Sequence, residues 1–156
     1  MLAIGFTLMS NTTSGSLVEA AHSARAQSHS PFSKFRVGAA VRTASGRVFT
    51  GSNVESSSYG LTICAERLAI CIAVHEGHSD ITEIAVVADT DGAPGPCGAC
   101  RQFMYDFAPR AVVFMENLRG DSRQVQVEEL IPWGFGPADL LGRESIPAGE
   151  RSGSDD

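Results

Sequence analysis

The sequence contains no block of lysine and arginine, no hydrophobic run long enough to cross a bilayer and no recognisable export signal. Its 12 basic and 18 acidic residues give a formal net charge of −6. Because phosphate backbones normally bind to a clustered basic face, we do not expect a long nucleic acid as a partner. A small ligand without phosphate groups is compatible with this charge.

The apolar residues near the amino terminus are too few for a membrane segment. They form a run of about eight without a basic leading region, whereas a spanning helix needs roughly 20 residues. We therefore expect no membrane partner and a cytoplasmic location, in which cysteines are reduced or bind metal. Residues 1–13 are predicted to be flexible, and the polar tail at 142–156 is predicted to be disordered.

The stretch between these ends, residues 14–141, has the size of one globular domain. Hydrophobic periodicity and turn residues predict helices at 16–26, 64–76, 98–107 and 137–141, and strands at 37–41, 47–50, 84–88, 111–115 and 123–127. This order predicts an α/β fold, a three-layer sandwich in which helices cover a mixed sheet of about five strands. A helix joins strands 84–88 and 111–115, so we expect that pair to be parallel.

Particular residues are expected to set the ends of these elements. Ser16 and Glu19 fit a capping box at the start of the first helix. The residues Ala44-Ser45-Gly46 predict the turn of a hairpin, followed later by a polar loop at 51–61. The helix at 64–76 is strongly apolar, so we expect it to be mostly buried, with Gly77 at its end.

Two of the four cysteines, Cys97 and Cys100, form a Cys-x-x-Cys pattern at the start of a predicted helix. Both thiols can face one tetrahedral ion across such a turn. By itself the pattern is ambiguous, because it also occurs in redox pairs, in half of a structural zinc site and by chance.

A third cysteine, Cys64, also begins a predicted helix, so the positive ends of two helices can face one point. Three thiolates leave one position of a tetrahedral zinc shell open, which is typical of catalytic sites. Cys71 lies two turns further along the helix, roughly 10 Å away, and is predicted to be a core residue.

Two charged residues follow Cys64 directly. Glu66 can take a proton from a water at the metal and pass it on, although a solvated glutamate at a helix start is the alternative interpretation. Arg67 is the candidate cation that offsets the charge of three thiolates, with a surface arginine as the alternative.

Four segments match the pattern of a known family. They are Ser33-Lys34-Phe35, Gly51-Ser52-Asn53-Val54-Glu55, Tyr59-Gly60-Leu61-Thr62-Ile63-Cys64-Ala65-Glu66-Arg67 and Pro96-Cys97-Gly98-Ala99-Cys100-Arg101-Gln102. A cysteine or histidine before x-Glu, with a later Pro-Cys-x-x-Cys, is the signature of zinc deaminases. From about Ser16 to Leu141 the chain resembles the cytidine deaminase family, specifically its small homotetrameric branch.

The resemblance implies zinc-dependent hydrolytic deamination of cytidine and 2′-deoxycytidine to uridine and 2′-deoxyuridine, with release of ammonia, in pyrimidine salvage. It implies one zinc per subunit on Cys64, Cys97 and Cys100, with Glu66 carrying protons. Arg67 and Gln102 would lie next to the zinc ligands without binding the metal themselves.

The resemblance also implies the substrate contacts, which would come from Phe35, Asn53, Glu55, Ala65 and Phe135. Phe35 would stack on the pyrimidine, while Asn53 and Glu55 would bind the sugar hydroxyl at the 3′ position. The latter two side chains share one side of an extended segment. Phe135 would reach the pocket of a neighbouring subunit, giving a homotetramer with composite active sites.

Two departures from the family leave the substrate open. After Glu55 the family usually has Asn-Ala-x-Tyr, whereas this chain has Ser56-Ser57-Ser58-Tyr59, and Gly95 stands where serine is common. The changes border the sugar and the leaving amine. A deaminase of a blasticidin-like antibiotic cytosine nucleoside is therefore an alternative. A non-catalytic zinc assembly domain, which predicts a fourth protein ligand, and a polynucleotide editor are others.

Overall fold

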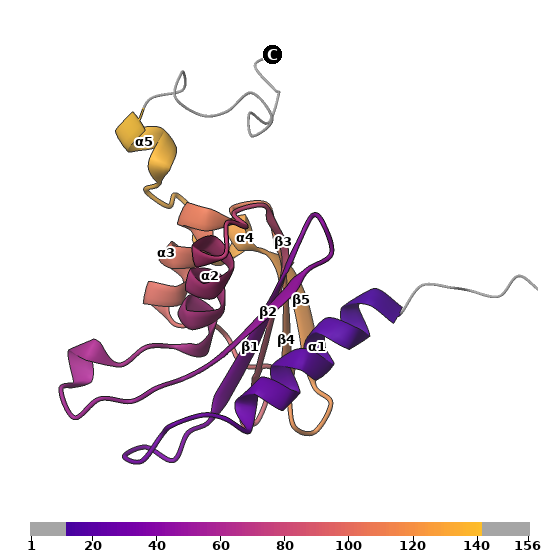
Figure 1. The fold of residues 1–156 in the computed structure, drawn as a ribbon, viewed down its shortest axis with the longest axis vertical. Helices are drawn as coiled ribbons and strands as arrows, with labels where there is room; N and C mark the ends of the chain where they lie inside the picture. Colours follow the sequence, from indigo (N-terminus) through magenta and orange to yellow (C-terminus); the bar gives the residue numbers. More distant parts are fainter. Residues whose placement is uncertain (1–11, 142–156) are drawn as a thin grey trace, which may run out of the picture.

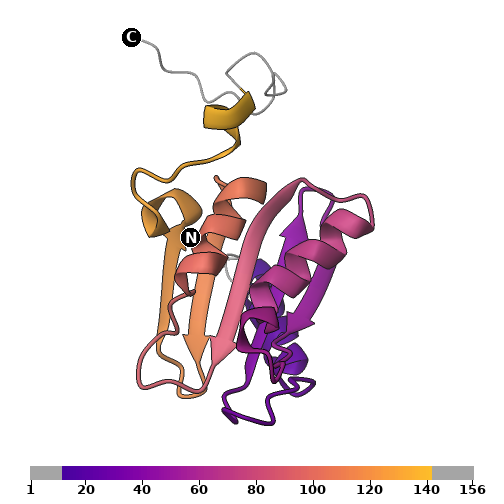
Figure 2. The same ribbon diagram turned by 90° about the vertical axis from the view of Figure 1, so that its left-hand side faces the viewer.

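A five-stranded sheet forms the middle of three layers in the computed structural model, which describes residues 12–141. Helix α1 (Thr12–Arg25) covers one face of the sheet (Figure 1). Helices α2 (Ala65–His75) and α3 (Gly98–Phe107) lie side by side over the other face (Figure 2). The predicted α/β sandwich is confirmed.

The sheet has the strand order β2-β1-β3-β4-β5. Its strands are β1 (Val37–Thr43), β2 (Val48–Ser52), β3 (Ile81–Ala88), β4 (Val112–Asn117) and β5 (Ser122–Gln126). Strands β3 and β4 are parallel, as their helical connection predicts, and the other neighbours are antiparallel. The hairpin of β1 and β2 turns at Gly46, whose φ of +86° is easily reached without a side chain.

Alternate residues of the central strands point into two separate cores. On the α1 side, Ala40, Ala85 and Val87 pack against the helix. On the side of α2 and α3, the larger core contains Val41, Ile84 and other apolar residues. The second core forms the floor beneath the starts of α2 and α3, where the cysteines lie.

The first helix begins earlier than its sequence signals suggest. It starts at Thr12, so the predicted capping box is wrong and Ser16 lies within the helix. There the Ser16 hydroxyl accepts a hydrogen bond of 2.9 Å from Arg42 of β1. A local side-chain pattern cannot reveal that β1 holds this serine. Residues 1–11 and 142–156, with their predicted flexibility, lie outside the described part of the chain.

Helix α2 is buried on only one face, so two predictions about it are wrong. Its buried residues, Ala65, Glu66, Ala69, Ile70 and Ala73, follow helical spacing, and Ala73 ends the stripe. Cys71 is exposed rather than core, and Ile72 and Val74 are also exposed. The sheet and α3 cover one side of the helix, and an apolar composition does not say which side that is.

Helix α2 lies close to the sheet because β2 carries a glycine at their crossing. A Cβ at Gly51 would lie 2.5 Å from the carbonyl oxygen of Ala65 and 2.6 Å from the amide nitrogen of Ala69. Such distances are shorter than van der Waals contacts, so only glycine fits. The glycine therefore sets the position of the first turn of α2.

Smaller elements complete the described chain. Strand β5 ends one residue before its predicted end, and α4 (Val127–Leu130), with a capping box of Gln126 and Glu129, follows it without having been predicted. The polar loop contains a short 3₁₀ helix, η1 (Tyr59–Leu61), and α5 (Pro137–Leu141) projects from the body in both views (Figures 1 and 2). No helix within residues 12–141 has the length and apolar character to span a bilayer.

Candidate active site and metal centre

Three cysteines meet where α2 and α3 begin. Cys64 is the N-cap residue of α2 and Cys97 that of α3, and neither side chain makes a capping hydrogen bond. Their sulfur atoms are therefore available to another partner, unlike the oxygen of a usual N-cap serine or aspartate. Cys100, in the first turn of α3, is fully buried.

The positions of the three sulfurs fit a zinc ion. All three Sγ atoms lie within 4.8 Å of one another, and those of Cys64 and Cys97 are 3.9 Å apart. With Zn–S bonds near 2.3 Å, the sulfurs of a tetrahedral site lie about 3.8 Å apart. Within residues 12–141 no fourth histidine, cysteine or carboxylate joins this cluster, so one coordination position stays open.

Cys64 favours the thiolate form, whereas its hydrogen bond with Cys100, followed by burial, raises the pKa of Cys100. The hydrogen bond from the Cys100 side chain, followed by that from Arg67, lowers the pKa of Cys64 to about 5. Arg67 Nη2 lies 3.6 Å from the Cys64 sulfur and donates to the Thr62 carbonyl oxygen at 2.8 Å. Arg67 thus stands where a cation offsets the negative charge of three thiolates.

Glu66 lies on the buried face of α2, beside the sulfurs. Only 4% of its surface is exposed, and the Cys100 side chain hydrogen-bonds to it. Burial, more than the charge on Cys64, raises the pKa of the Glu66 carboxyl. A buried carboxyl with a raised pKa exchanges protons more readily near neutral pH than a solvated one does.

Two residues that the sequence analysis did not single out hold the loop before α3. Arg101 donates through Nε to the Pro96 carbonyl at 2.8 Å and through Nη1 to that of Leu130 at 3.2 Å. Asn117, at the end of β4, donates to the Thr90 carbonyl at 3.0 Å and is almost fully buried. Leu130 lies 29 residues from Arg101, and Thr90 lies 27 residues from Asn117, so no local pattern identifies these two bonds.

The loop at 28–36 is fastened to the sheet by Asn53. Its Oδ1 atom accepts hydrogen bonds from the Ser28 hydroxyl at 2.6 Å and from the Val37 amide at 2.8 Å. Its Nδ2 atom donates to the Phe35 carbonyl at 2.8 Å. Asn53 is 8% exposed, so its side chain is part of the structure that positions Phe35.

Glu55 binds the tip of the same loop. Its carboxylate accepts hydrogen bonds from the amides of Phe32, at 2.8 Å, and Ser33, at 3.2 Å, and from the Ser33 hydroxyl. The hydroxyl bond is the main reason why the pKa of Glu55 is lowered. Asn53 and Glu55 therefore face one side, as the alternation of an extended segment predicts.

A hollow of about 400 Å³ adjoins Glu55. It is lined by Phe32, Ser33, Glu55, Ser56, Tyr59 and Thr62. Phe35 lies outside this lining and is 44% exposed. Thr62, which also lines the hollow, accepts a hydrogen bond from Arg67, and Arg67 in turn contacts the Cys64 sulfur.

The remaining predicted site residues lie in different surroundings. Ala65 is fully buried in the first turn of α2. Gln102 uses its amide nitrogen to bind Asp106 Oδ1 and the Phe135 carbonyl, both at 2.8 Å. That amide therefore ties the carboxyl-terminal segment to α3. Phe135 is 61% exposed.

Comparison with known families agrees with this geometry. The model of the cytidine and deoxycytidylate deaminase zinc-binding region matches residues 11–116. The chain belongs to this family. It is accordingly a hydrolytic deaminase with one zinc ion per chain, for which the cluster of Cys64, Cys97 and Cys100 provides the site.

Individual relatives support the assignment over most of the chain. A cytidine deaminase of Halalkalibacterium halodurans is 46% identical over 125 residues, which are 80% of this chain and 95% of the relative. A probable cytidine deaminase of Dictyostelium discoideum is 43% identical over 127 residues, or 81% of this chain and 86% of the relative. The crystal structure of cytidine deaminase from Burkholderia pseudomallei superposes with a TM-score of 0.78 at 44% identity, covering 80% of this deaminase and 100% of that chain.

Proposed function

We propose that this deaminase hydrolyses the 4-amino group of cytidine and 2′-deoxycytidine, giving uridine or 2′-deoxyuridine and ammonia in pyrimidine salvage. The observation that carries the proposal is the buried Glu66 carboxyl beside three sulfurs that leave one metal position open. The names of the relatives support the substrate class.

Glu66 has the position of the residue that moves protons. When bound, zinc acts as a Lewis acid that makes water a nucleophile near neutral pH. Glu66 takes one proton from the attacking water and delivers it to N3 of the cytosine ring as the C4–O bond forms. It then transfers the second proton to the amino group, and the C4–N bond breaks with loss of ammonia.

The proposed nucleoside contacts are Glu55 and Phe35. Glu55 lines the hollow next to the site and keeps a carboxylate there, which can accept a hydrogen bond from a sugar hydroxyl. Phe35 presents an exposed ring on the loop that Asn53 fastens. Stacking of a base on such a ring contributes about 1–3 kcal/mol.

The proposed quaternary structure is a homotetramer in which Phe135 completes a neighbour's pocket. Support comes from the apolar residues exposed on the carboxyl-terminal segment: Trp133, Phe135, Leu140 and Leu141. Mixing tests this arrangement. Subunits with Phe135→Ala and subunits with Glu66→Gln are each expected to have low activity, and hybrids are expected to regain part of it. Hybrids without any gain would contradict shared active sites.

The decisive experiment on the reaction is an ultraviolet assay of the purified protein on a panel of aminopyrimidine nucleosides. We expect cytidine and 2′-deoxycytidine to be consumed, and a chelator that removes zinc to stop the reaction. A blasticidin-type nucleoside belongs in the panel, because Ser56 adjoins Glu55. Turnover of that compound alone, or of no nucleoside in the zinc-loaded protein, would refute the proposed substrates.

A further inference from the structure

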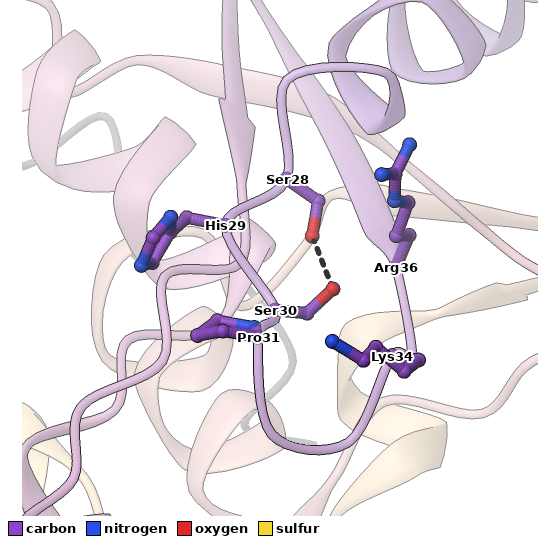
Figure 3. Close-up of a pocket in the computed structure, with 6 residues that line it drawn as sticks. All are labelled: Ser28, His29, Ser30, Pro31, Lys34 and Arg36. Carbon is purple, nitrogen blue, oxygen red and sulfur yellow. Dashed lines mark hydrogen bonds between the residues drawn. The ribbon is translucent and has the colours of Figure 1, made fainter.

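The loop between α1 and β1 contains another hollow, whose lining differs from that beside Glu55. Its volume is about 290 Å³, and its lining residues are Ser28, His29, Ser30, Pro31, Lys34 and Arg36 (Figure 3). None of these six is acidic, although the whole chain has a formal charge of −6. They include the only lysine of the sequence. Positive charge is thus concentrated at one small site of an acidic protein.

Lys34 and Arg36 supply this charge. Both residues are exposed, and within residues 12–141 neither side chain makes a hydrogen bond or an ion pair. The Lys34 ammonium points toward Ser30, and Arg36 lies on the same side of the serines with its exposed side chain extended away from Lys34 (Figure 3). The His29 ring points the other way, so it is not counted among the binding groups.

The same hollow also contains two serine hydroxyls, those of Ser28 and Ser30. The Oγ atoms of Ser28 and Ser30 are 3.3 Å apart and face each other (Figure 3). Each hydroxyl has one hydrogen, and that of Ser28 is better placed on Asn53 Oδ1, at 2.6 Å. The hydroxyl of the buried Ser30 can therefore direct its own hydrogen toward a ligand.

The backbone at this hollow is strained. Lys34 has a φ of +61°, a left-handed conformation that is uncommon for residues other than glycine. Its amide closes a turn by donating to the Ser30 carbonyl at 3.1 Å. Strain of this kind persists where surrounding contacts enforce it, and it is found often at ligand sites.

We propose that this hollow binds a phosphate-type anion through Lys34, Arg36 and the Ser30 hydroxyl. A guanidinium fork, an ammonium and a hydroxyl together suit a tetrahedral anion with several acceptor oxygens. The site is also linked to the deaminase loop, because Ser28 binds Asn53, which in turn binds the Phe35 carbonyl. An anion bound in the hollow is therefore connected to Phe35 through these two hydrogen bonds.

Calorimetric titration of inorganic phosphate into the zinc-loaded protein tests the proposal. Chloride keeps the ionic strength constant, because screening alone changes the affinity for an anion. The double variant Lys34→Gln, Arg36→Gln is compared with Arg123→Gln, which removes a positive charge from the exposed strand β5. We expect saturable binding to the wild type and to Arg123→Gln, weakened by about tenfold or more in the double variant.

Uridine 5′-monophosphate and uridine distinguish a nucleotide from free phosphate. If the hollow binds the phosphate of a nucleotide, the monophosphate binds more tightly than uridine, and the double variant abolishes the difference. If it binds free phosphate, the two bind alike while inorganic phosphate still depends on both cations. Either result supports the anion site.

Equal phosphate affinity in wild type and double variant, or no saturable binding to the wild type, would overturn the proposal. Circular dichroism and zinc content check that the double variant is folded, and Ser30→Ala provides a second variant that keeps both charges. These are binding measurements, so they stand whether or not the protein deaminates cytidine.

Discussion

The metal centre and the loops beside it are built in different ways. The centre is formed by the first turns of two helices that pack on a fully buried core, and its reactive groups are fixed by backbone geometry. The loops at 28–36 and 53–62 have little core of their own. They are joined by side-chain hydrogen bonds from Asn53 and Glu55 to distant backbone groups.

This difference indicates what each region contributes. Helix starts hold the sulfurs and Glu66 to a fixed geometry, which a metal and a proton carrier require. Hydrogen-bonded loops can adjust to a sugar and a base, but they depend on a few polar residues to keep their shape. Changes at the centre are therefore expected to abolish chemistry, whereas changes in the loops are expected to alter stability and substrate affinity.

The largest effect is expected from loss of a sulfur ligand. Cys100→Ser should reduce bound zinc from about one ion per chain to nearly none and remove activity, because a serine oxygen is a poor zinc ligand. Metal analysis and the ultraviolet assay measure both. Cys71→Ser on the exposed side of α2 is the control and should keep zinc and turnover. Full zinc content in Cys100→Ser would contradict the expectation that changes at the centre abolish chemistry.

The second largest effect is expected from Glu66, the proposed proton carrier. Glu66→Gln keeps the size of the side chain but cannot carry a proton, so kcat should fall by about 10²–10⁴-fold. Zinc content and thermal stability should remain close to the wild type. The matched control is Glu76→Gln at the other end of α2, with normal kcat. Ordinary turnover by the Glu66 variant would show that another group transfers the protons.

Asn53→Ala is expected to affect the loop and leave the centre intact. It leaves the Val37 amide and the Phe35 carbonyl without their partner, which should lower the free energy of unfolding by about 1–3 kcal/mol. KM should rise because Phe35 loses its support, while zinc content stays unchanged. Denaturant unfolding and steady-state kinetics measure the two effects, with Gln124→Ala on exposed β5 as control. Loss of zinc in this variant would mean that the two regions are not separable.

The smallest expected effect concerns pH. The Ser33 hydroxyl and two amides hold the pKa of Glu55 below its ordinary value of 4.5 in the folded protein. The resulting stabilisation is fully present above the pKa of the unfolded chain and is lost as pH falls through the lower folded value. Thermal melting of wild type and Glu55→Gln should therefore differ above pH 4.5 and converge as the pH falls from 4.5 through the lower folded pKa. A difference that grows on acidification would contradict this assignment.

Much of the fold follows from local pattern, because the strand and helix periods and the turn glycines act over a few residues. The boundaries of α3 and α5 agree with their predictions, as does the parallel pair of β3 and β4. The errors concern contacts between elements. Ser16 lies within α1 and binds Arg42 of β1, and Cys71 faces outward because the sheet covers only the opposite side of α2.

The candidate site divides in the same way. Cys64, Glu66, Cys97 and Cys100 could be found from sequence because each pair lies within one helical turn, where spacing fixes geometry. Arg101, Asn117 and the glycine at position 51 could not, since the Leu130 carbonyl, the Thr90 carbonyl and helix α2 lie outside the helix or strand to which each residue belongs.

The sequence by itself thus determined the layered fold and the candidate residues Cys64, Glu66, Cys97 and Cys100, because hydrophobic periods and the spacing of each pair act within single elements. The packing of α2 beside α3 decided that Cys64 meets Cys97 and Cys100. Only the tertiary structure decided that Asn53 and Glu55 fasten the loop of Phe35, and that Lys34 and Arg36 gather without acidic neighbours. Such arrangements depend on the packing of β1 and β2 against α1 and α2. The Asn53 and Glu55 contacts join groups 18 and 23 residues apart, and a local pattern carries no information about contacts at such separations.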